Sequence, residues 1–152
     1  MNIFLPVLVI IIVLLLSMVF KNAYAPSKSG VKNGKLAKIS SSPNAVSSQA
    51  YLDNQKVEPL KFIGNLEETR NRILNILNDY EGASIYSEGK DYIHAVLTSG
   101  KFNLKNDVEF YFDEKAEVVH FRSASRVGFS HRGKSRKNYQ EIKDLYYKDN
   151  KQ

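Results

Sequence analysis

Residues 128–135, "GFSHRGKS", have the spelling of a phosphate-binding loop: two glycines with four residues between them, followed by Lys134 and Ser135. In a nucleoside triphosphatase such a loop follows a strand of a parallel sheet, and a further acidic strand holds magnesium. Only residues 136–152 follow this loop, and the preceding strand patterns are separated by turns too short for a parallel crossover. We therefore expect neither nucleotide binding nor a cofactor.

The segment around this loop is strongly basic, because no Asp or Glu occurs between Val118 and Gln140. Its last cations crowd the expected start of a helix, whose dipole also favours anions. The sequence thus predicts a binding site for an anion at a strand-to-helix turn. The candidate residues are Arg122, Ser123, Ser125, Arg126, Arg132, Lys134 and Arg136, with Asp107 and Glu109 as supporting carboxylates. Alternatively, Arg122 and Arg126 form structural ion pairs with nearby carboxylates, Glu88 among them.

A hydrolase is a second hypothesis, with Ser123 or Ser125 as nucleophile and a histidine as base. The candidate histidines are His94, His120 and His131. No Gly-x-Ser-x-Gly elbow accompanies the serines, so no residue is assigned as catalytic. We expect no metal, since the histidines lack ligand spacing within one element and the chain contains no cysteine.

These residues must be positioned by a small α+β domain. "VEPLKFIG" predicts a first strand, and Asn65 with Glu68 predicts a capping box that opens a helix over 66–80. Four alternating strands and a closing amphipathic helix follow, giving the order β-α-β-β-β-β-α, with about five mainly antiparallel strands and two helices.

Alternation along the strands predicts two different sheet faces. The face expected against the helices carries Ile85, Ile93, Ala95, Leu97, Val108, Phe110, Phe112, Val119 and Phe121. The opposite face carries Tyr86, Glu88, Tyr92, His94, Glu109, Tyr111, His120 and Arg122. An antiparallel sheet can leave one face wet, so we expect this second face to be open to solvent or to a partner, or to hold ordinary cross-strand pairs.

Residues 3–20 contain no charged side chain, so the sequence predicts an N-terminal membrane helix. A cleaved signal peptide is the alternative, because "AYA" at 23–25 has a small-x-small form. We divide the chain into an anchor (1–21), a flexible basic tether (22–55), an α+β domain (56–148) and a tail (149–152).

Five juxtamembrane lysines account for most of the net charge of +6, which leaves the domain nearly neutral and argues against nucleic-acid binding. They are expected to contact anionic lipid, and their position favours a cytoplasmic domain. These residues are Lys21, Lys28, Lys32, Lys35 and Lys38.

The segments "GVKNGKLA", "SPNAVSSQA", "NDVEFYFDE" and above all "RSASRVGFS" resemble the bacterial and plant domain-of-unknown-function family 1499. The resemblance implies no activity. It does imply an exported or membrane-attached protein, which favours a periplasmic domain on a single-pass protein of the cell (inner) membrane. We expect a membrane-anchored, non-enzymatic domain that binds an anionic ligand or a protein partner. A structural envelope or assembly protein is the third hypothesis.

Overall fold

The computed structural model describes residues 3–24, 29–41, 43–127 and 133–148. Its N-terminal elements are helix α1 (Phe4–Ala23), strands β1 (Val31–Lys32), β2 (Lys35–Leu36) and β3 (Ala45–Ser47), a 3-10 turn η1 (Asp53–Gln55) and β4 (Leu60–Lys61). They are followed by α2 (Leu66–Asp79), β5 (Ala83–Glu88), β6 (Tyr92–Ser99), β7 (Leu104–Asp113), β8 (Val118–Ser125) and α3 (Lys134–Tyr147). The α+β class expected from the sequence is confirmed.

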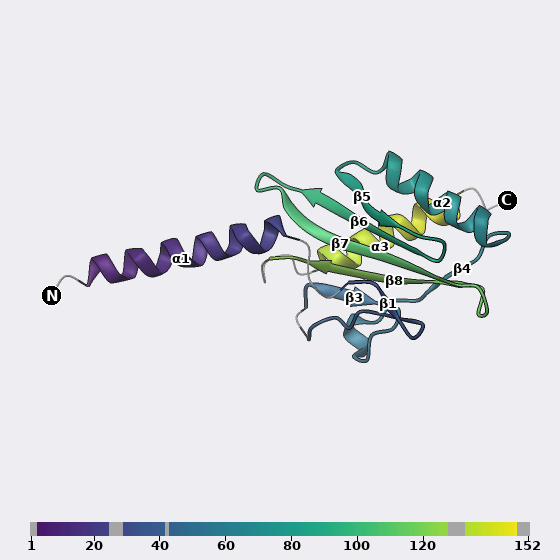
Figure 1. The fold of residues 1–152 in the computed structure, drawn as a ribbon, viewed down its shortest axis with the longest axis horizontal. Coiled ribbons are helices and arrows are strands. Elements are labelled where there is room, and N and C mark those ends of the chain that lie inside the picture. The colour runs from purple at the N-terminus through teal and green to yellow at the C-terminus, as the bar shows by residue number, and fades with distance from the viewer. Residues whose placement is uncertain (1–2, 25–28, 42, 128–132, 149–152) are drawn as a thin grey trace.

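The main sheet is antiparallel and has six strands rather than about five. Its order is β3-β8-β7-β6-β5, and β4 also pairs with β8 (Figure 1). Strands β5 to β8 form the predicted meander, since each pairs with the next in the chain. The additional strand β3 comes from the segment expected to be a tether.

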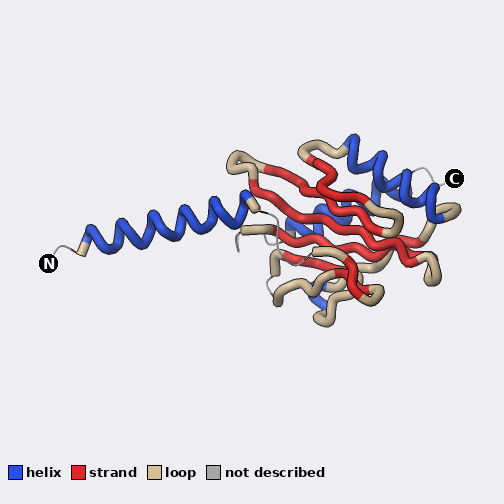
Figure 2. The backbone as a smooth tube through the Cα atoms, viewed as in Figure 1, coloured by secondary structure: helices blue, strands red, loops and turns tan. Residues whose placement is uncertain are grey.

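Helices α2 and α3 cover one face of this sheet (Figure 2). The predicted apolar residues of β6, β7 and β8 on this face are all buried, and Ile73, Leu77 and Ile142 of the two helices pack against them. The exception is Ile85, which keeps its predicted register opposite Ala95 but is exposed because β5 is the edge strand. The capping box of Asn65 and Glu68 opens α2 as predicted.

Gly82, in the turn between α2 and β5, has a positive φ of 77°. A Cβ added there would lie 2.3 Å from the carbonyl oxygen of Thr98, whereas one added to Gly100, with φ of 75°, would meet nothing within 4 Å.

We therefore expect Gly100→Ala to lower the free energy of unfolding by about 1 kcal/mol, from backbone strain alone, and Gly82→Ala by about 3 kcal/mol. Urea unfolding followed by circular dichroism measures both values. Equal losses in the two variants would show that the contact with Thr98 does not matter.

The second face of the sheet is covered rather than open, contrary to our expectation. His94, Glu109 and Arg122 on this face are buried, and residues 30–41 and 43–50 fold across the part of it that Glu109 and Arg122 occupy. The amide of Gly30 donates to Glu109 Oε1 at 2.7 Å, and β3 pairs with β8. Among the described residues predicted for this face, Tyr86 of edge strand β5 stays exposed. A bulge between Ile85 and Ser87 turns Glu88 to the other face, where it pairs with Ile93 in register and with Arg70 of α2.

Residues 30–50 thus differ from the flexible tether that the sequence suggested. Their short apolar stretches have no sustained period, so nothing local predicts a strand. The three residues of β3 gain their hydrogen-bond partners from β8, which lies far away in the sequence. The structure therefore places part of the expected tether within the fold.

Helix α1 projects away from the sheet as a single rod (Figure 1). Within the described residues it is the one helix that is long and apolar enough to cross a membrane, judged by length and composition, with a mean hydropathy of 2.8. None of its residues is buried. The C-terminal end of α1 nevertheless contacts the domain, as described below.

Candidate functional site

The predicted site residues lie on both faces of the sheet. Arg122 of β8 and Arg126, the first residue after β8, project onto the second face. Ser123 and Ser125 of β8 project toward α3. Neighbouring residues of a strand point in opposite directions, so one flat cluster is impossible. The structure divides the predicted anion-binding set into two separate groups.

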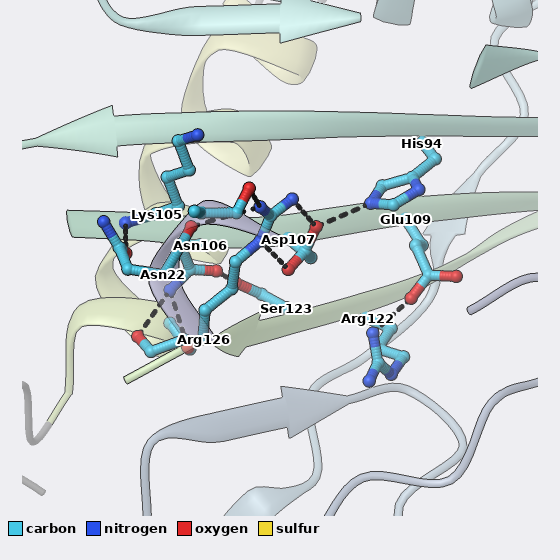
Figure 3. Close-up of polar contacts among 12 residues, drawn as sticks. Asn22, His94, Lys105, Asn106, Asp107, Glu109, Arg122, Ser123 and Arg126 are labelled. Carbon is cyan, nitrogen blue, oxygen red and sulfur yellow. Dashed lines mark hydrogen bonds and ion pairs between the residues drawn. The ribbon is translucent and has the colours of Figure 1, made fainter. Parts of the chain in front are cut away.

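The first group is a buried ion pair between Arg122 and Glu109 (Figure 3). The hydroxyl of Tyr92 donates to Glu109 Oε1 at 2.6 Å, and the Gly30 amide donates to the same oxygen. The glutamate is completely buried. Burial, together with this hydrogen bond, raises the pKa of Tyr92 and keeps its hydroxyl protonated as a donor.

The second ion pair joins Arg126 to Asp107. The guanidinium makes two contacts of 2.8 Å, from Nε to Oδ2 and from Nη2 to Oδ1. His94 Nε2 lies 2.8 Å from Asp107 Oδ1 on the other side. Burial alone would raise the pKa of Asp107, but Arg126 and His94 outweigh it and hold this pKa below its usual value of 3.8. The carboxylate is therefore fully ionised at neutral pH.

The same arginine holds the end of α1. Arg126 Nη1 donates to the carbonyl oxygens of Asn22 and Ala23 at 3.3 and 3.4 Å, where a helix C-terminus favours a cation. Asn22 also donates to Asn103 O at 3.0 Å and accepts from the Lys105 amide at 2.9 Å (Figure 3). Arg122 and Arg126 are thus both engaged in structural ion pairs, which is the alternative that the sequence offered for these two arginines.

The serines belong to a separate hydrogen-bond group on the helix-covered face. Ser123 Oγ donates to Asn106 Oδ1 at 2.7 Å, and Asn106 Nδ2 donates to Ser125 Oγ and to Ser135 Oγ. His94 and His120 project from the opposite face, so neither can act as base for these serines. His131, the third histidine of the hydrolase hypothesis, lies outside the described residues.

The remaining cations surround the start of α3. Arg136 donates to the carbonyl oxygens of Asn54 and Lys56 at 2.9 and 3.1 Å, and Lys134 is the first residue of the helix. Arg132 lies outside the described residues, as does most of the phosphate-loop spelling. Anion binding at this turn stays a prediction.

A serine–histidine contact that the sequence reasoning missed lies on the second face. Ser48 Oγ is 3.2 Å from His120 Nδ1, and His120 Nε2 is 4.0 Å from Asp113 Oδ2. The order resembles a catalytic triad, but Ser48 Oγ also accepts the Phe121 amide at 2.9 Å and thereby ties residues 48 and 121 together. A separation of 72 residues hides this contact from sequence reasoning.

His120 gives a pH dependence with a defined sign. Burial lowers its pKa below the usual 6.5, and Asp113 only partly opposes this. Its stabilising contribution is therefore complete above about pH 6.5 and is lost as the pH falls through the folded-state pKa.

We expect His120→Gln to lose less stability than the native chain when the pH is lowered from about 7.5 to about 5.5. Urea midpoints at the two pH values measure this difference. An identical loss in both proteins would contradict the assignment to His120.

An open cleft of about 860 Å³ lies between the end of α2, the β6–β7 turn and the start of α3. The residues that line it are Asp79, Tyr80, Glu81, Gly82, Leu97, Thr98, Ser99, Gly100, Asn103, Lys134, Asn138, Glu141, Asp144 and Leu145. The hydroxyl of Tyr80 donates to Glu141, and burial followed by this contact raises the pKa of Tyr80. Among the described residues, no cluster of His, Cys, Asp and Glu could hold a metal ion.

Asn138 is the unusual member of this lining. Its exposed fraction is 0%, and neither Oδ1 nor Nδ2 has a hydrogen-bond partner within the described part of the chain. An unsatisfied buried amide costs about 1–3 kcal/mol, so such groups call for a partner. Sequence reasoning missed Asn138 because one asparagine in an amphipathic helix carries no signal of its own.

Fold and site together define a small α+β domain with an N-terminal apolar helix, a buried arginine–carboxylate face and an open cleft. The chain belongs to the family described as Protein of unknown function (DUF1499), whose model matches residues 35–145. This match confirms the resemblance found in the sequence, and it begins within the segment that folds across the second face. No curated protein and no solved structure matches the chain.

Proposed function

We propose that this protein is a membrane-tethered, non-enzymatic binding module whose cleft takes a positively charged polar group, such as an ammonium or a guanidinium. The observation that carries the proposal is the fully buried Asn138 amide, which lacks a partner at the lining of the cleft. An ammonium or a guanidinium has N–H donors and no acceptor, so such a ligand would bond to Oδ1 of this amide and not to its Nδ2.

The charge of the cleft supports a cation as the ligand. The described lining contains four carboxylates, from Asp79, Glu81, Glu141 and Asp144, against the single ammonium of Lys134. The sequence had instead suggested an anion, partly from Arg122, Arg126 and Arg136, which have carboxylate or backbone partners. A free polyamine and a lysine or arginine side chain of a partner protein share the required chemistry.

A non-enzymatic role is favoured because the serines that could act as nucleophiles are hydrogen-bonded within the fold. Ser123 and Ser125 bond to Asn106, and Ser48 is tied to the backbone of Phe121. None of the three lines the cleft. A hydrolase would need its nucleophile beside the ligand.

The proposal is tested by Asn138→Leu in the full chain in detergent. Leucine has nearly the same volume, so loss of the unsatisfied amide should raise the free energy of unfolding by about 1–2 kcal/mol. The same change should abolish binding of spermidine or of an arginine-containing dipeptide, measured by isothermal titration.

Asn71→Leu serves as the matched control, since Asn71 is an exposed asparagine of α2 that does not line the cleft. This variant should bind like the native chain. If Asn138→Leu binds both probes unchanged, or the native chain binds neither, the proposal is wrong. The two probes also separate the sources of the cation: a free polyamine or a partner protein.

A further inference from the structure

The turn between β6 and β7 lies beside the C-terminal end of α1 (Figures 1 and 2). Asn22 of the helix bonds to the carbonyl of Asn103 in this turn and to the amide of Lys105 just after it. The Asn103 amide in turn donates to Gly100 O at 3.1 Å, which closes the turn. The turn and the C-terminal end of α1 therefore lie at the same height along the axis of α1.

In a membrane crossed by α1, this height corresponds to the membrane surface. The helix is apolar up to Phe20, and Lys21 is its first charged residue. Lysines at the end of a membrane helix place their ammonium groups among the lipid headgroups. Because Asn22 follows directly, the turn bonded to it also reaches the headgroup region.

The side chains of the turn suit this location. Phe102 is 82% exposed, and the neighbouring Lys101 is exposed as well. An exposed phenylalanine next to a lysine is typical of segments that dip into the interface of a bilayer containing anionic lipid.

We propose that the β6–β7 turn is a second membrane contact, in which Phe102 enters the interfacial zone of the bilayer and Lys101 binds anionic headgroups. The inference rests on α1 crossing the membrane, as in the proposed function, but not on ligand binding in the cleft. It adds a point of attachment to the lysines of residues 21–38.

Two attachments fix the orientation of the domain, because a single helix end leaves it free to tilt. Arg126 reinforces this arrangement, since it bonds to the last carbonyls of α1 while Asp107 holds its guanidinium. Gly100 and Asn103 belong both to the turn and to the cleft lining. The cleft is consequently held at the bilayer surface.

The chain contains no tryptophan, so a single introduced tryptophan reports its own surroundings. Phe102→Trp in the full-length protein is reconstituted in vesicles of phosphatidylcholine and phosphatidylglycerol, with and without brominated acyl chains. Tyr51→Trp is the control, because Tyr51 is 98% exposed and follows edge strand β3. We expect blue-shifted emission and bromine quenching at position 102, and neither at position 51.

Equal emission and quenching at the two positions, in protein that floats with the vesicles, would overturn the inference while leaving the anchor intact. A blue shift at position 102 without bromine quenching would indicate a protein contact and would overturn it as well. Protein that does not float with vesicles would refute the membrane helix itself. Titration of the cleft is measured separately, so its failure is distinguishable from all of these outcomes.

The role of Lys101 is tested by Lys101→Glu in the Phe102→Trp background. Quenching should fall in vesicles with phosphatidylglycerol and should change little in vesicles of phosphatidylcholine alone. Equal quenching in both lipid mixtures would remove Lys101 from the proposed contact.

Discussion

Glu109→Ala is expected to lower the free energy of unfolding by about 3–5 kcal/mol, a large part of the stability of a domain of this size. The change leaves the Arg122 guanidinium buried without its carboxylate and also removes the acceptor of Tyr92 and Gly30. Urea unfolding of the full chain in detergent, followed by circular dichroism, measures the loss.

The matched control is Glu88→Ala, which breaks the ion pair between Glu88 of edge strand β5 and Arg70 of α2. Glu88 is 48% exposed, and exposed pairs of this kind contribute less than about 1 kcal/mol. A similar loss in both variants would mean that burial of the Glu109 pair has no special effect. The double variant Glu109→Leu with Arg122→Met should lose less than the sum of the two single changes, since it leaves no unpaired charge.

Asp107→Ala is expected to cost about 3 kcal/mol and also to loosen the contact between α1 and the sheet. Without the carboxylate, Arg126 loses the group that orients it toward the carbonyls of Asn22 and Ala23. Amide hydrogen exchange at Lys105, whose N–H bonds to Asn22, should become faster relative to exchange in the middle of β7. A uniform increase along β7 would indicate general destabilisation instead.

The same variant has a defined pH dependence. The pKa of Asp107 lies below its usual value of 3.8 in the folded state, so its stabilising contribution is present above that value and is lost as the pH falls through the folded-state pKa. The native chain should therefore lose stability below about pH 4, and Asp107→Ala should lack this part of the loss. Parallel curves for the two proteins would contradict the assignment.

The sequence predicts the parts of the fold that have a local period. The capping box marks the start of α2, and the structure confirms it. The alternation of β6 to β8 predicts which of their residues form the core, and these residues are buried. The covered second face could not be predicted, because it depends on β3 pairing with β8, which lies far away in the sequence. Ile85 is exposed because β5 is the edge strand, and the bulge that turns Glu88 to the helix-covered face leaves no mark in the sequence.

The candidate site was predictable only in part. Pairing of Arg122 and Arg126 with carboxylates follows from cross-strand neighbours of β7 and β8, and the sequence offered it as an alternative. The predicted anion site combined Arg122 and Arg126 with Ser123 and Ser125. Side chains alternate between the two faces along β8, so the arginines and the serines lie on opposite faces of the sheet. Asn138 was invisible, because only the packing around it shows that its amide has no partner.

The most direct test of the binding cleft is a nuclear magnetic resonance titration of the ¹⁵N-labelled full chain in nanodiscs with spermidine, an arginine-containing dipeptide and inorganic phosphate. We predict saturable shifts of the Asn138 side-chain amide and of the backbone amides of Gly82 and Ser99 with one or both cations, and no such shifts with phosphate. Shifts at these three residues with phosphate alone, or with none of the probes, would contradict the proposed function.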